Sequence, residues 1–72
     1  MIVGKLHPEK MAAGIRATRA ALNLTQEQFG ALAGLSRPTI ARMEEDPSRT
    51  KITTYLKIYP IIERTLSDLI FK

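Results

Sequence analysis

Residues 24–44 have the sequence LTQEQFGALAGLSRPTIARME, which contains the start and stop signals of two short helices. At the first start, Thr25 can cap the helix while Gln28, three residues later, bonds back to the backbone N–H of Thr25. Leu24 and Phe29 are spaced to pack against each other across this first turn. These three signals agree and predict a helix over residues 26–33.

The connection that follows is short and also carries its own signals. Gly34 supplies the left-handed residue that ends the first helix, and Leu35 is expected to enter the core. Ser36 caps the next helix, in which Pro38 is tolerated because it lies in the first turn. A second helix is therefore predicted over residues 37–44, and a connection this short makes the pair a helix-turn-helix.

Helical spacing also appears before this motif. Pro8 is typical of a first helical turn, and Met11, Ile15 and Leu22 recur at the helical period. This pattern predicts a helix over residues 8–22.

After the motif, residues 46–50 favour a loop, and the helical period resumes at Ile52. Pro60 lacks an amide donor and clashes with the preceding turn, so this helix is expected to end or kink near Tyr59. A final helix is predicted over residues 60–72. Residues 65–71 also alternate at period two, so a short terminal strand is the competing interpretation. The fold class is therefore all-α and compact, with five helices.

Length and composition limit the classes of protein to consider. The chain has 72 residues, which suits a single domain over residues 1–72, with residues 1–6 expected to be flexible. It has no cysteine and one histidine, His7, so we expect no disulfide, metal or other cofactor. Its sequence shows no signal peptide and no apolar run long enough to cross a bilayer, which favours a cytoplasmic protein without a membrane partner.

The charge balance favours a polyanionic partner. The formal net charge is +4 and the pI is about 9.9. Within residues 1–24, four Lys and Arg side chains face a single acidic side chain, Glu9, whereas the rest of the chain is close to neutral. The excess positive charge is thus local.

Residues 15–70 resemble the Cro/repressor (XRE) family of helix-turn-helix DNA-binding domains. The resemblance rests on the Leu-Thr-Gln start at residues 24–26, the Ala-Gly-Leu-Ser turn at residues 33–36, Ile40 and Glu44. It implies a lambda-repressor-like fold and double-stranded DNA as the partner. The chain departs from the family at Gly30, where alanine is usual, and near Glu63, where glycine is usual.

In a helix-turn-helix, the second helix normally enters the major groove. Ile40 and Met43 must face the core, so the outward side chains are expected to contact bases. Arg37 is the best candidate, because its guanidinium matches the O6 and N7 acceptors of guanine. The predicted base contacts are Arg37, Pro38 and Arg42, and the predicted contacts to the DNA backbone are Gln26, Ser36, Thr39, Arg49 and Lys51.

The family pattern also implies a structural ion pair between Arg19 and Glu44, which would tie the first helix to the end of the third. A second structural prediction concerns the apolar stripe in the last part of the chain, which is larger than one small domain can cover. Part of it is expected to pack into the core, and the remainder to meet a two-fold mate. The residues assigned to this homodimer interface are Ile61, Ile62, Leu66, Leu69, Ile70 and Phe71.

These observations predict a sequence-specific transcriptional regulator that binds a pseudo-palindromic operator as a dimer, and the family resemblance implies that it acts as a repressor. An alternative comes from residues 44–47 and 52–58, which resemble HipB-type antitoxins that hold a toxin kinase and repress their own operon. An enzyme is not expected, because these residues provide no nucleophile paired with a base, no phosphate-binding glycine loop and no metal cluster.

Overall fold

The computed structural model of the chain describes residues 7–71, so the flexibility expected for residues 1–6 concerns a segment outside the described residues. All regular structure in this range is helical. The elements are α1 (Pro8–Leu22), α2 (Gln26–Ala33), α3 (Arg37–Glu45), a short 3-10 turn η1 (Pro47–Arg49) and α4 (Ile52–Phe71). The predicted bounds of α1 and α2 are confirmed, and the strand considered for residues 65–71 is wrong because these residues belong to α4.

The predicted number of helices is also wrong, because Pro60 lies inside α4 and does not divide it. Four α-helices therefore replace the expected five in the described range. Proline at this position removes the hydrogen bond to the Leu56 carbonyl, but Leu56 and Pro60 are both exposed. Water can therefore replace the lost donor, while Ile58 and Ile62 are buried on either side of the proline and hold both halves of α4 against the core.

The core lies where the four helices meet, and each of them contributes to it. Its buried members are Ile15 of α1, Phe29 of α2, Ile40 and Met43 of α3, and Ile58 and Ile62 of α4. Two leucines lie outside this core, and one of them, Leu22, belongs to the apolar period noted for residues 8–22. Leu22 is 42% exposed and Leu32 is 60% exposed, and together with Ile61 they line a shallow groove beside α4.

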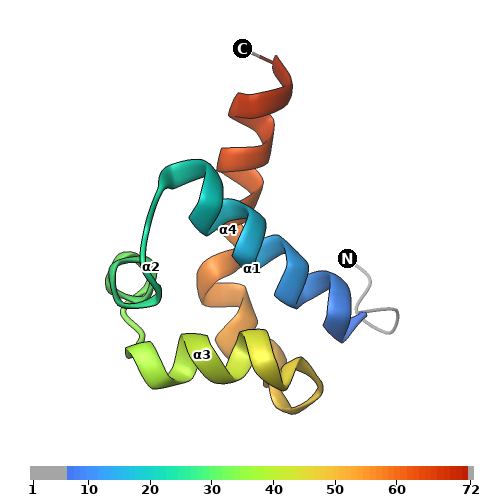
Figure 1. Cartoon of the computed structure of the whole chain (residues 1–72). Coiled ribbons are helices and arrows are strands. Elements are labelled where there is room, and N and C mark those ends of the chain that lie inside the picture. Colours follow the sequence, from blue (N-terminus) through green and yellow to red (C-terminus); the bar gives the residue numbers. More distant parts are fainter. Residues whose placement is uncertain (1–6, 72) are drawn as a thin grey trace.

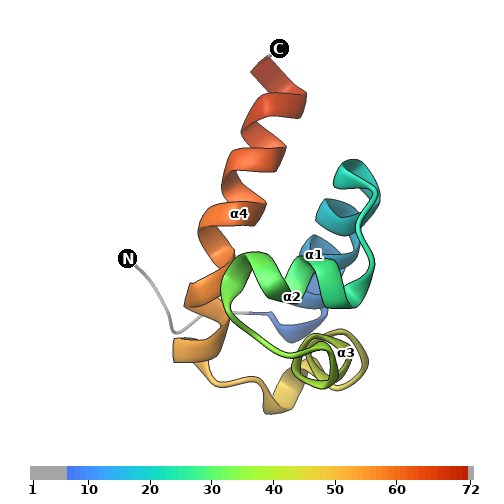
Figure 2. The same cartoon turned by 90° about the vertical axis from the view of Figure 1, so that its left-hand side faces the viewer.

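The helices are arranged so that α3 lies at one end of the molecule and α4 leads away from it. Figure 1 shows α3 across the base, and α4 rising behind α1 until its C-terminal turns project beyond the other helices. In Figure 2, α3 is seen end-on at the base, with α1 and α2 on one side of α4 and its other side uncovered by them. The described chain therefore has a base formed around α3 and a projecting end formed by α4.

Left-handed residues end the first two helices. Asn23 follows α1 with φ 58°, and Gly34 follows α2 with φ 73°. After Gly34, the backbone N–H of Leu35 donates to the Gly30 carbonyl at 2.8 Å, which closes the turn. A Cβ added at Gly30 would lie 2.5 Å from the Leu35 carbonyl oxygen, so this turn is too tight for the alanine usual in the family.

Candidate nucleic-acid interface

The starts of α2 and α3 are fixed by the caps that the sequence predicts. The backbone N–H of Gln28 donates to Thr25 Oγ1 at 3.0 Å, and the backbone N–H of Thr25 donates to Gln28 Oε1 at 2.9 Å. At α3, the backbone N–H of Thr39 points to Ser36 Oγ at 3.4 Å, and the two hydroxyls lie 2.9 Å apart. Both hydroxyls at the start of α3 therefore already have a structural role.

One face of α3 is buried and the opposite face is open. Ile40 and Met43 are buried in the core, as expected. The three residues predicted to contact bases, Arg37, Pro38 and Arg42, are all exposed. Arg37 and Pro38 occupy the first turn of α3, and Arg42 lies just over one turn further on.

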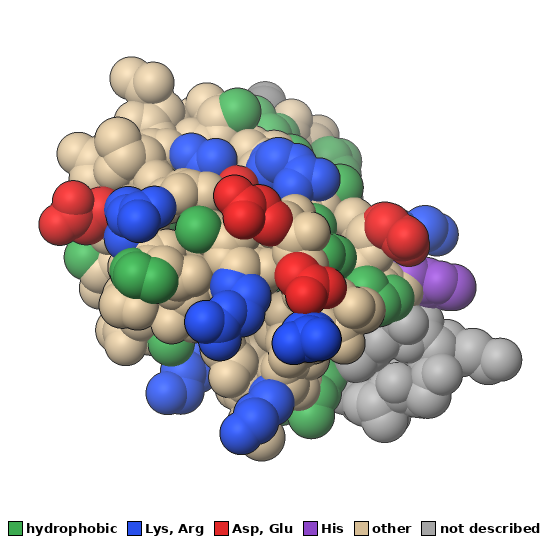
Figure 3. Space-filling model, turned by 60° about the horizontal axis from the view of Figure 1, so that its bottom comes forward, with side chains coloured by type: hydrophobic (Ala, Val, Ile, Leu, Met, Phe, Trp, Pro, Cys, Tyr) green, Lys and Arg blue, Asp and Glu red, His purple; other side chains and the backbone are tan. Residues whose placement is uncertain are grey.

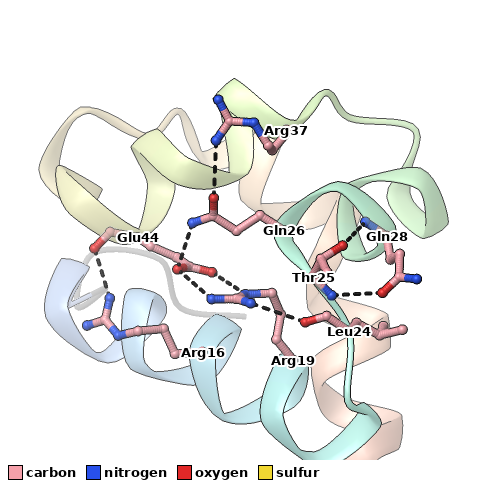
Figure 4. Close-up of polar contacts among 8 residues, drawn as sticks. All are labelled: Arg16, Arg19, Leu24, Thr25, Gln26, Gln28, Arg37 and Glu44. Carbon is pink, nitrogen blue, oxygen red and sulfur yellow. Dashed lines mark hydrogen bonds and ion pairs between the residues drawn. The ribbon is translucent and has the colours of Figure 1, made fainter.

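A chain of polar contacts connects α1 to the start of α3 (Figure 4). Arg19 donates to Glu44 through Nε to Oε2 at 2.7 Å and through Nη2 to Oε1 at 3.1 Å. Gln26 Nε2 donates to the same Oε1 at 3.1 Å, and Arg37 Nη1 donates to Gln26 Oε1 at 3.4 Å. The expected ion pair is thus linked through Gln26 to a predicted base-contacting side chain.

Arginines of α1 also hold the backbone of neighbouring elements. Arg16 Nη1 donates to the Glu44 carbonyl at 2.9 Å, and Arg19 Nη1 donates to the Leu24 carbonyl at 3.1 Å. Two positive charges therefore lie at the C-terminal end of α3, where the helix dipole and the adjacent acidic residues favour them. The Glu44 side chain is 5% exposed and that of Arg19 is 23% exposed, so the carboxylate is the more buried partner of the pair.

The sequence did not reveal the roles of Arg16 and Gln26. The role of Arg16 could have been predicted, because Arg16 precedes Arg19 by three residues and therefore lies on the same face of α1. Gln26 had none, because Glu44 is 18 residues away in the chain. Since both ends of the Gln26 amide have partners here, its backbone N–H at the start of α2 is the group that remains available for a phosphate.

A second cluster lies beside α3, in a hollow formed with η1 and the start of α4. Arg42, Arg49 and Lys51 bring positive charge to it, and three threonines line it as well. Arg49 is also paired with Asp46, at 3.3 Å from Nε to Oδ2, but its side chain is 80% exposed. The residues lining the hollow are Thr39, Arg42, Met43, Arg49, Thr50, Lys51 and Thr54.

This hollow belongs to the base of the molecule. Figure 3 shows that side, with Lys and Arg side chains spread over it and fewer acidic side chains between them. Threonine hydroxyls, cationic side chains and the first turn of a helix are all groups that bind phosphate. The hollow is therefore lined by three residues that were predicted to contact the DNA backbone: Thr39, Arg49 and Lys51.

The residues predicted for a dimer interface divide into two groups. Ile62 is buried in the core, and Ile61 is half-buried against it. Leu66, Leu69, Ile70 and Phe71 are exposed on the projecting end of α4, and Phe71 is the most exposed at 82%.

Comparison with known families matches this arrangement. A family model described as Helix-turn-helix matches residues 15–58, from the middle of α1 into α4. The chain belongs to the helix-turn-helix family. This is the XRE type of DNA-binding transcription regulator, as the motif at residues 24–44 indicates. No curated protein and no solved structure matches this helix-turn-helix protein. Within residues 7–71, no helix is both long enough and apolar enough to cross a membrane.

Proposed function

We propose that this chain is a sequence-specific repressor of transcription that binds a pseudo-palindromic DNA operator as a two-fold dimer. The observation that carries the proposal is the exposed face of α3, which presents Arg37, Pro38 and Arg42. The opposite face of the same helix is held in the core by Ile40 and Met43. A rigid helix with a guanidinium in its first turn suits the guanine edge in the major groove.

In the proposed binding mode, one set of groups contacts the bases and another set contacts the phosphates. Arg37 and Arg42 contact bases, with Pro38 packed against a thymine methyl or a sugar. The hollow beside α3 and the backbone N–H groups at the start of α2 bind phosphates on either side of the groove. Phosphate contacts set the position of α3, and the base contacts give the preference for one sequence.

Footprinting on genomic fragments tests this function. Protection of two inverted half-sites about 34 Å apart, one turn of DNA, is the expected result for a two-fold dimer. Uniform, sequence-independent protection would contradict sequence-specific binding. Reduced transcription from a promoter that overlaps the protected site would support repression, and increased transcription would contradict it.

Purification of the chain from its native cells tests the antitoxin alternative. The groove lined by Leu22, Leu32 and Ile61 is an exposed apolar surface of the kind that protein partners cover. A kinase that co-purifies in stoichiometric amount with the chain from its native cells would favour the antitoxin over a stand-alone repressor. Recovery of the chain without any second protein would favour the repressor.

A further inference from the structure

An ion pair lies at the edge of the hollow beside α3. Three cationic side chains line this hollow, and Arg49 is the one that is paired with an acidic side chain in the described range. Its Nε lies 3.3 Å from Asp46 Oδ2. Asp46 does not line the hollow itself, so its contact with the hollow runs through Arg49.

The short turn η1 imposes this pair. A 3-10 helix has about three residues per turn, so residues three apart lie one above the other. Asp46 precedes η1 and Arg49 ends it, and the backbone N–H of Arg49 donates to the Asp46 carbonyl at 3.1 Å. The hydroxyl of Ser48 donates to Asp46 Oδ1 at 3.1 Å. One carboxylate oxygen is thus held by the turn while the other faces Arg49.

The pair is too exposed to contribute much to the stability of the fold. The side chains of Arg49 and Asp46 are 80% and 49% exposed, and ion pairs in such positions contribute little because water solvates both charges. The situation changes when DNA binds, because a phosphate brings a second anion to the same guanidinium. The main consequence of the pair therefore concerns what the hollow binds.

We propose that Asp46 competes with DNA phosphate for Arg49 and so lowers the affinity of the hollow for the DNA backbone. This inference deepens the proposed function, because it rests on the hollow contacting that backbone. An arginine can donate to both anions at once, but the carboxylate and the phosphate then repel each other at close range. Separation from Asp46 avoids the repulsion and costs the ion pair instead.

The effect of Asp46 is the same for every DNA sequence. Contacts to phosphate carry no sequence information, so Asp46 lowers the affinity for the operator and for random DNA alike. The base contacts proposed for Arg37 and Arg42 lie on α3 and do not involve Asp46. Asp46 therefore sets the overall affinity, while the preference for one sequence stays with α3.

The dependence of binding on salt should show this competition. Each cation that neutralises a DNA phosphate releases counterions, which makes the affinity fall more steeply as salt increases. Because Asp46 already neutralises part of the Arg49 charge, Arg49 contributes less than a full charge to this dependence. Removal of the Asp46 charge should restore the full contribution.

Asp46→Asn tests the proposal, since asparagine keeps the size of the side chain and removes its charge. The affinity for a random-sequence DNA duplex is measured over a series of salt concentrations. Binding at low salt should tighten about two- to fivefold, the plot of log affinity against log salt should steepen by up to about 0.9, and the melting temperature should stay unchanged. Unchanged affinity would overturn the proposal, and so would weaker binding, which would mean that Asp46 orients Arg49 toward the phosphate.

Glu45→Gln is the matched control. It changes the net charge by the same amount one residue away, and Glu45 is exposed and forms no ion pair within residues 7–71. The gain in affinity for Glu45→Gln should therefore be smaller than that for Asp46→Asn. Equal gains would show that net charge, and not the pair with Arg49, limits binding.

A double variant shows whether Asp46 acts through Arg49. In a protein that already carries Arg49→Ala, the additional change Asp46→Asn should leave the affinity and the salt slope unchanged. A gain that persists in this background would overturn the proposal. Failure of Arg49→Ala itself to weaken binding would instead refute the assignment of Arg49 to the DNA backbone in the proposed function.

Discussion

At the scale of single residues, two glycines of this chain differ in the space available for a side chain. A Cβ added at Gly14 would lie 3.7 Å from the Ile62 side chain, which is an ordinary contact. At Gly30 it would lie 2.5 Å from a backbone oxygen of Leu35 and 3.2 Å from Ile40. The same chemical change is therefore expected to have opposite effects at the two positions.

Gly14→Ala should raise the free energy of unfolding by roughly 0.5–1 kcal/mol, because alanine is favoured over glycine inside a helix. Gly30→Ala should lower it by roughly 1–3 kcal/mol, because the α2–α3 turn must open to admit the methyl group. Thermal denaturation of the two variants tests this contrast. A stabilised Gly30→Ala protein would mean that the turn is looser than described.

Tyr55 makes stability sensitive to alkaline pH. Burial raises the pKa of Tyr55 above its ordinary value of 10.0, and the charge that Tyr59 acquires on ionisation raises it further. The folded state therefore holds the Tyr55 proton more tightly than the unfolded state does. The corresponding stability is complete below pH 10 and is lost as the pH rises from about 10 through the raised pKa.

Tyr55→Phe should make this alkaline loss of stability shallower, as measured by denaturant unfolding at a series of pH values. Tyr59→Phe removes only the smaller cause of the raised Tyr55 pKa, so it should flatten the curve less. A Tyr55→Phe protein whose stability falls with pH as steeply as that of the unmodified chain would contradict this explanation.

At the scale of the elements, the local signals predicted the short helices well and the last helix poorly. The caps at Thr25 and Ser36 and the turn at Gly34 act within four residues, so sequence alone indicates where α2 and α3 begin and where α2 ends. The continuity of α4 through Pro60 depends on Ile58 and Ile62 packing against distant parts of the chain. That packing overrides the local preference of proline, and no pattern around Pro60 shows it.

The polar contacts between α1 and α3 were likewise predicted only in part. Arg19 and Glu44 are named by the family pattern, but the extension through Gln26 to Arg37 depends on how α2 is placed between them. The side chains predicted to contact DNA could likewise be chosen from the helical period of α3, whereas the hollow formed by η1 and α4 could not.

Arg19→Ala and Glu44→Ala should each lower the melting temperature, and the double variant should lose less than the sum of the two. Removing one partner of a buried pair typically costs about 3–5 kcal/mol, and the partial exposure of Arg19 places this pair below that range. A thermal-melt cycle of the two single variants and the double variant measures the coupling.

The pair Asp46–Arg49 is the internal control, because its side chains are 49% and 80% exposed. The corresponding cycle there should give a coupling near zero, as exposed pairs do. Additive losses at Arg19 and Glu44 would contradict a direct ion pair between α1 and α3.

At the scale of the whole molecule, the two ends of the described chain have different surfaces. The base carries the exposed arginines of α3 and the hollow with Arg49 and Lys51, and the projecting end carries exposed apolar residues of α4. Exposed cationic side chains therefore gather at the base, and exposed apolar side chains gather at the projecting end. Under the proposed function the base is the part that binds DNA, and α3 distinguishes one DNA sequence from another.

The most direct test of that claim is the ratio of affinities for the footprinted duplex and for random DNA, measured by competition at one fixed salt concentration. Arg37→Ala should lower this ratio by a factor that corresponds to about 1–3 kcal/mol, because a base contact is lost. Arg49→Ala should weaken binding to both DNAs alike and leave the ratio unchanged, because Arg49 is assigned to the DNA backbone. An Arg37→Ala protein with an unchanged ratio would contradict recognition by α3.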